Sequence, residues 1–198
     1  MENIKQRLSE VAHSWVHIGM ITLFLFGVQP SAIETQANAS EQIREERRSE
    51  LVLEQDKNKI EKLKKETLEK FSNTVYKPSE MLTDKELVNL LWAVGFEGKA
   101  LKTAWAIAKT ESNARPLAYN GNRNTGDSSY GIFQINMLGE LGIDRKEKFE
   151  LRSNILLFDP VVNAEITYYM TQGGTDWSSW SSMKTGAIKK WLDKFPNQ

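Results

Sequence analysis

The chain has 198 residues, and its 26 Lys and Arg balance 26 Asp and Glu, so the formal net charge is zero. A general nucleic-acid binder needs an excess of cations to neutralise phosphates, so we expect no nucleic-acid partner. Cysteine is absent, which excludes disulfides, thiolate metal sites and cysteine nucleophiles. Because both histidines, His13 and His17, lie near the N-terminus, a later domain works without imidazole catalysis or histidine-bound zinc.

The N-terminal segment has the composition of an export signal. A short basic region precedes an apolar stretch over residues 15–28, and the small-residue pattern Ala37-Asn38-Ala39 follows. Cleavage after Ala39 is the first interpretation, but counted from Val11 the apolar region is long enough for an uncleaved membrane anchor. We therefore expect residues 1–39 to be a signal peptide or an anchor, with the protein exported to the periplasm or cell-wall side, or membrane-anchored. N-terminal sequencing of the expressed protein distinguishes the two.

The next segment, residues 40–76, is highly charged. Between Glu41 and Lys70 there are nine acidic and nine basic residues and neither glycine nor proline. Good helix formers with opposite charges three or four positions apart predict a long solvated helix. Its apolar residues do not keep a seven-residue repeat, so we interpret it as a charged helical spacer rather than a coiled-coil dimer.

Capping residues, periodicity and glycine breaks predict a compact, mostly helical domain over residues 77–198. Thr83 and Glu86 are spaced as a capping box at the start of its first helix. The expected elements are a helix from that box to Gly95, a helix over 99–112, a turn-rich stretch over 113–136 with a strand-like run at 130–135, a helix over 159–170 and a last helix over 183–194. The expected fold class is therefore mainly α, an α+β domain with a small β-hairpin, preceded by the charged helix and the N-terminal hydrophobic segment.

One acidic residue of the second helix falls on its apolar face. On a helical wheel Glu111 lies between Ile107 and Ala104, whereas Lys102 and Lys109 point away. Burial disfavours the charged carboxylate, so we expect a raised pKa, which is what a general acid for glycosidic cleavage requires. The alternative is a glutamate that faces water at a frayed helix end, although the helix dipole disfavours a carboxylate there.

Three ordered motifs carry a resemblance to a known family. They are Ala108-Lys109-Thr110-Glu111-Ser112, Gly126-Asp127-Ser128-Ser129-Tyr130-Gly131-Ile132-Phe133-Gln134-Ile135-Asn136 and Leu157-Phe158-Asp159-Pro160-Val161-Val162-Asn163-Ala164. Together they resemble the lytic transglycosylases of the goose-lysozyme-like superfamily, closest to short bacteriophage wall-degrading and virion proteins. The resemblance covers residues 87–191. It implies a lysozyme-like fold, peptidoglycan glycan strands as partner, and phage lysis or virion partners and a virion location as a further alternative.

The resemblance also assigns roles to individual residues. It makes Glu111 the single catalytic acid/base and Ser112 a group that positions the sugar. The polar groups that it places within reach of an N-acetylated sugar are Tyr130, Gln134 and Asn136. It further implies that Tyr168 or Tyr169 hydrogen-bonds the catalytic carboxyl. Ile132, Phe133 and Ile135 are expected in the core, as are Trp177 and Trp180, for which stacking on sugars is the alternative.

The implied activity is cleavage of the β-1,4 bond between N-acetylmuramic acid and N-acetylglucosamine with a 1,6-anhydro product. No metal or cofactor is expected. Asp127 is a possible second carboxylate, which would make the enzyme a hydrolytic muramidase, or it shapes the Gly-Asp turn. A non-catalytic peptidoglycan-binding or virion structural protein that keeps the fold is the third alternative.

Overall fold

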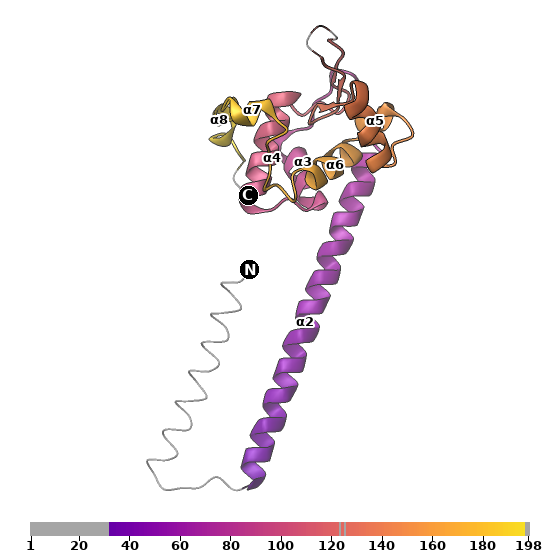
Figure 1. Cartoon of the computed structure of the whole chain (residues 1–198). Helices are drawn as coiled ribbons and strands as arrows, with labels where there is room; N and C mark the ends of the chain where they lie inside the picture. Colours follow the sequence, from indigo (N-terminus) through magenta and orange to yellow (C-terminus); the bar gives the residue numbers. More distant parts are fainter. Residues whose placement is uncertain (1–31, 123, 125, 197–198) are drawn as a thin grey trace. The chain divides into compact units, whose positions relative to one another are not determined.

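A computed structural model describes residues 32–122, 124 and 126–196 (Figure 1). The apolar stretch at 15–28, predicted to be a signal or an anchor, lies outside the described residues, so its role stays a prediction. Within the described part of the chain, no helix has both the length and the apolar character needed to cross a membrane.

Helix α2, Ala32–Ser72, is the long charged helix. It begins earlier than the predicted start at Ser40, and its backbone includes the Ala37–Ala39 pattern. Every side chain from Ser40 to Leu63 is exposed, which confirms the prediction of a solvated helix.

The chain divides into two compact units, Met1–Lys57 and Asn58–Gln198. The last turns of α2 thus belong to the second unit, in which Phe71 is buried and Leu68 packs against the core. Lys64 pairs with Glu97 across 3.7 Å. The second unit therefore begins inside α2, whereas the sequence predicts a domain boundary at residue 77.

Three helices form the centre of the second unit, and Figure 1 shows them together. They are α3 (Asp84–Val94), α4 (Gly98–Glu111) and α6 (Pro160–Met170). Helix α3 contacts both α4 and α6. It starts at the predicted capping box, where the Thr83 hydroxyl accepts from the Glu86 backbone N–H. Helix α6 starts where the Asp159 carboxylate accepts from the Val161 N–H, with proline in the first turn.

The remaining helices are shorter and were harder to predict. They are α5 (Gly139–Lys148), the 3₁₀ helix η2 (Asn154–Phe158), α7 (Ser181–Lys184) and α8 (Lys189–Leu192). Helix α5 was not predicted, because its one buried residue is Gly142 and it has no apolar face. The single last helix predicted over 183–194 is wrong. The chain breaks into α7 and α8 around Gly186, whose φ is 72°.

The small sheet has three antiparallel strands in the order β1-β2-β3, namely Tyr119–Asn120, Ser129–Tyr130 and Ile135–Asn136. The strand-like run predicted at 130–135 thus begins in β2 and ends in β3, with a tight turn over residues 131–134 between them. Gly131 begins this turn with φ 73°, and a Cβ there would collide with the Asn163 side chain and the Leu157 carbonyl. Only glycine fits this close approach between the turn and α6.

The hydrophobic core lies among these helices and the β2–β3 turn. Trp105 of α4 is fully buried, and Ile132, Phe133 and Ile135 of the turn and β3 join the same cluster, as predicted. The core therefore anchors the turn to the helices on both sides of it.

Candidate functional site

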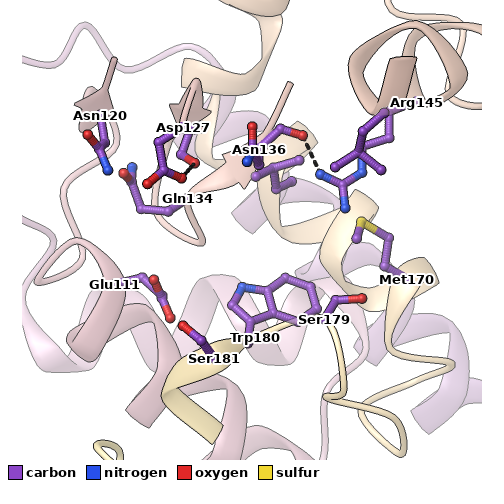
Figure 2. Close-up of a pocket in the computed structure, with 13 residues that line it drawn as sticks. Glu111, Asn120, Asp127, Gln134, Asn136, Arg145, Met170, Ser179, Trp180 and Ser181 are labelled. Atoms are coloured by element: carbon purple, nitrogen blue, oxygen red, sulfur yellow. Dashed lines mark hydrogen bonds between the residues drawn. The ribbon is translucent and has the colours of Figure 1, made fainter. Parts of the chain in front are cut away.

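A pocket of about 370 Å³ opens between the small sheet and the C-terminal end of α4 (Figure 2). The sheet and its loops line one wall with Asn120, Asp127, Ser129, Gln134, Ile135 and Asn136. Figure 2 shows Glu111, Ser179, Trp180 and Ser181 along the opposite wall. Leu141, Arg145 and Met170 complete the lining. Four predicted site residues therefore meet here, namely Glu111, Asp127, Gln134 and Asn136.

Glu111 is the last residue of α4, and its half-buried carboxyl faces the pocket. The Ser182 hydroxyl donates a hydrogen bond of 2.5 Å to Glu111 Oε1. Burial raises the pKa of Glu111, the Ser182 hydrogen bond opposes that shift, and the negative charge of Asp127 adds to it. The net effect is a raised pKa, as predicted from the position of Glu111 on the apolar face of its helix. The carboxyl therefore holds its proton to higher pH than a free glutamate.

The basic residue nearest to Glu111 in sequence is held elsewhere. Lys109 Nζ lies 3.0 Å from Asp84 Oδ1 and 5.0 Å from the ring centre of Trp191. Its ammonium group therefore does not neutralise Glu111, and among the described residues no cation contributes to the shifted pKa of Glu111.

Asp127 lies on the wall opposite Glu111 (Figure 2). Its Oδ1 accepts a hydrogen bond of 3.2 Å from the Ser129 hydroxyl, and its backbone N–H donates to the Asn122 carbonyl. Asp127 thus shapes the turn before β2, and its carboxylate lines the pocket. Its role as a second catalytic carboxylate stays a prediction.

Ser112 does not line the pocket, in contrast to the sugar contact that the resemblance implies. It is 3% exposed, and its hydroxyl donates to the Ile132 carbonyl at 2.8 Å and accepts from the Arg115 N–H. These hydrogen bonds join the end of α4 to the β2–β3 turn. Ser112 is therefore a positioning residue for Glu111, which precedes it in the chain.

Gln134 and Asn136 differ in which of their side-chain hydrogen-bonding groups are still available to a ligand. Gln134 has φ 49°, and its Nε2 donates to the carbonyls of Gly131 and Ala118 at 2.9 and 3.2 Å. This leaves its amide oxygen without a hydrogen bond to any described residue. The Asn136 side chain instead bonds three backbone groups, accepting from Ser128 and Leu138 and donating to Gly126. Asn136 therefore holds the loop that carries Asp127, and Gln134 is the better candidate for a sugar contact.

The structure does not bring the predicted tyrosines of α6 to the Glu111 carboxyl. Tyr168 packs edge-on against Phe96, with ring centres 4.9 Å apart, and Tyr169 packs against Phe149. Successive residues of a helix point about 100° apart. Because Met170 of α6 points into the pocket, Tyr168 and Tyr169 point in other directions. Ser182 of α7 occupies the place at Glu111 that the resemblance gives to a tyrosine.

Tyr130 also lies outside the pocket lining. Its ring packs against Tyr119 and Phe158, with ring centres 4.9 and 5.4 Å apart. Its hydroxyl accepts from Ser128 at 3.3 Å and from Asn154 at 3.5 Å. These hydrogen bonds lower the pKa of Tyr130. Tyr130 is therefore placed to brace β2 rather than to contact a sugar.

Two buried residues hold the wall that carries Gln134. Asn163 is fully buried, donates to the carbonyls of Tyr130 and Leu157 and accepts from the Phe133 N–H, each at 2.9 Å. The Trp180 indole N–H donates to the Phe133 carbonyl at 2.9 Å. Trp180 is thus a core residue, as expected, and it forms part of the pocket wall as well.

Sequence reasoning missed Ser182, Arg145 and the pocket residues Ser179 and Ser181. Ser182 is separated from Glu111 by 71 positions, and no local pattern links them. Within the described ranges, no three His, Cys, Asp or Glu side chains gather as a metal site requires.

Removing the Ser182 hydroxyl is expected to change the pH profile of activity. The hydrogen bond stabilises the charged form of Glu111, so Ser182→Ala should raise the Glu111 pKa further. A general acid works in its protonated form, so the alkaline fall of kcat/KM should move to higher pH. The matched control is Ser178→Ala, an exposed serine outside the lining. An unchanged alkaline limb in Ser182→Ala would show that another group controls it.

Comparisons with known proteins agree with this architecture. The sequence model of a family described as a lysozyme-like domain matches residues 88–182. A milk isozyme of lysozyme C from dog (Canis lupus familiaris) is 45% identical over 42 residues, which is 21% of this chain and 33% of that protein. The chain thus matches about a third of the length of this curated relative. No solved structure matches the chain.

Proposed function

We propose, from the membership of residues 88–182 in the lysozyme-like superfamily, that this protein cleaves the glycan strands of peptidoglycan. The observation that carries the proposal is the half-buried Glu111 carboxyl at the pocket wall, with its raised pKa. A carboxyl that holds its proton to higher pH than a free glutamate is better able to protonate the oxygen that leaves a sugar.

The finer proposal is a lytic transglycosylase that acts between N-acetylmuramic acid and N-acetylglucosamine. Protonated Glu111 donates its proton to the O4 leaving oxygen while the bond from muramyl C1 to that oxygen breaks. The Glu111 carboxylate then accepts the proton of the muramyl C6 hydroxyl as O6 bonds to C1. The products are a 1,6-anhydro sugar and a free O4 hydroxyl, Glu111 regains its proton, and water is not consumed.

The remaining wall supports this reaction by position and hydrogen bonding. Ser182 holds the carboxyl, and Gln134 presents an amide oxygen across the pocket from it (Figure 2). That oxygen is suited to accept from a sugar hydroxyl or an acetamido N–H.

A second candidate function is hydrolysis, which the position of Asp127 favours. Asp127 lies in the same pocket, and its negative charge raises the pKa of Glu111. In an inverting hydrolase, the second carboxylate activates a water on the face opposite the acid. Asp127 would then take the proton of that water, whose hydroxyl bonds to C1 as the leaving sugar departs.

Mass spectrometry of sacculi digested by the purified protein tests these proposals. The transglycosylase proposal expects muropeptides with anhydro ends, each one water lighter than the product with a reducing end. Reducing ends would favour the hydrolase. Protein that sediments with sacculi but releases nothing would favour a non-catalytic binder and would contradict both enzymatic proposals.

Asp127→Asn separates the two enzymatic mechanisms by rate. If Asp127 activates water, the substitution should lower kcat by about 100-fold or more. If the product is the anhydro sugar, the loss should stay below about 10-fold, because Asn keeps the turn and an acceptor for Ser129. Asp144→Asn, an exposed change outside the lining, is the matched control.

A further inference from the structure

The end of the pocket away from Glu111 differs in chemistry from the acidic part. Figure 2 shows Arg145 of α5 and Met170 of α6 there, separated from Glu111 by Trp180. Leu141 lies one helical turn before Arg145 on α5 and also lines the pocket. Arg145 is thus a cation at an end of the pocket that the apolar side chains of Leu141 and Met170 also line.

The Arg145 guanidinium is half-buried, and this burial lowers the pKa of Arg145. Its Nη1 donates to the Asn136 carbonyl, which holds α5 against β3. Among the described residues this is its one hydrogen bond, and the four ion pairs there all use lysines. A guanidinium has five N–H donors in a rigid fork. Most of the donors therefore remain for a ligand in the pocket.

A partly desolvated cation without a carboxylate partner costs free energy, and an anionic ligand group offsets that cost. The planar fork matches a carboxylate with two parallel hydrogen bonds. Asp127 also lines the pocket, and its carboxylate disfavours a ligand with greater negative charge than one carboxylate. The site at Arg145 therefore fits a single carboxylate with an apolar neighbour.

We propose that Arg145 is a specificity-determining residue that binds a carboxylate on the C3 substituent of muramic acid. This inference rests on the proposed function and names the feature of the substrate that the pocket recognises. Muramic acid differs from glucosamine by a lactyl ether at C3, which carries a carboxyl and a methyl group on one carbon. Arg145 binds the carboxylate, and Leu141 and Met170 contact the methyl group. In strands that carry stem peptides, the lactyl carboxyl is an amide, and the peptide supplies the carboxylate.

Binding to matched ligands tests this role without requiring turnover. The full chain with Glu111→Gln is titrated calorimetrically with a peptide-free tetrasaccharide of alternating N-acetylglucosamine and N-acetylmuramic acid. The reference ligand is the N-acetylglucosamine tetrasaccharide, which lacks the lactyl group. We expect the muramyl ligand to bind at least about 10-fold more tightly, as a charged hydrogen-bonded pair provides.

Adding Arg145→Met should remove this preference and leave the affinity for the reference ligand unchanged. Arg145→Lys should keep part of it, because lysine keeps the charge but loses the fork. Arg152→Met, an exposed arginine outside the lining, is the matched control and should keep the full preference.

The outcomes separate recognition from a structural role. Equal weakening for both ligands would show that Arg145 acts through the Asn136 carbonyl, and it would overturn the proposal, as would an unchanged preference. A preference seen only with a peptide-bearing muramyl ligand supports it and assigns the carboxylate to the stem. If the unsubstituted chain releases nothing from sacculi but the Arg145-dependent preference persists, the proposed function fails and this inference stands.

Discussion

Glu111→Gln is expected to abolish release of glycan fragments from sacculi, with kcat lowered by about 1,000-fold or more. The amide has nearly the shape of the carboxyl but cannot transfer the proton that the leaving oxygen needs. The measurement is fragment release followed by chromatography, with circular dichroism to show that the fold is retained. The exposed residue Glu147 provides the matched control, Glu147→Gln, which should keep full activity.

The same substitution carries an expected effect on stability, with a defined sign. Because the folded state raises the Glu111 pKa, the stability that its proton contributes is complete below the unfolded-state pKa. That contribution is lost as the pH rises through the folded-state pKa. Gln does not titrate, so Glu111→Gln should unfold at an equal or higher temperature than the unsubstituted chain at pH 7. Retained turnover in this variant would remove Glu111 from the mechanism.

Asn163→Ala is expected to destabilise the second unit by about 3 kcal/mol or more. The change removes the Asn163 partner of three backbone groups, namely the buried Leu157 carbonyl and Phe133 N–H and the part-buried Tyr130 carbonyl. Each unsatisfied buried group costs about 1–3 kcal/mol. Urea denaturation followed by tryptophan fluorescence measures the loss. Activity should fall as well, because the β2–β3 turn carries Gln134 into the pocket wall.

The matched control for this prediction is Asn89→Ala. Asn89 is an exposed residue of α3, and its replacement should change stability by no more than about 0.5 kcal/mol. A loss below about 1 kcal/mol in Asn163→Ala would show that the turn is held by other contacts, of which the Trp180 hydrogen bond to Phe133 is the strongest candidate.

Local sequence patterns account for the elements on which the site is built. The capping box at Thr83 and the Asp159-Pro160 start of α6 were both readable, because caps satisfy backbone groups within one helical turn. The burial of Glu111 followed from the period of α4, since one face of that helix packs on the core. The resemblance in turn placed a strand of the cleft in this stretch, whereas the structure has two short strands, β2 and β3, joined by a tight turn.

Local sequence patterns could not predict the side-chain contacts of the site. The sequence does not show which hydroxyl group donates to Glu111. Ser182 of α7 does so, because the packing of α6 places the Tyr168 ring against Phe96. The residues Ser112 and Asn136 were expected at the sugar because of their motifs. Packing instead assigned their polar groups to the backbone, where buried donors and acceptors require partners.

The amino-acid sequence alone predicts a charged solvated helix, a mainly helical domain and one glutamate on an apolar helix face. These features arise from interactions within a few turns of the chain, so periodicity and caps encode them. Folding in three dimensions decided the rest: that Asp127 faces Glu111 across a pocket, that Ser182 holds the carboxyl, and that Arg145 lines the far end. Those relations join residues far apart in the chain, and only close packing of several elements brings them together.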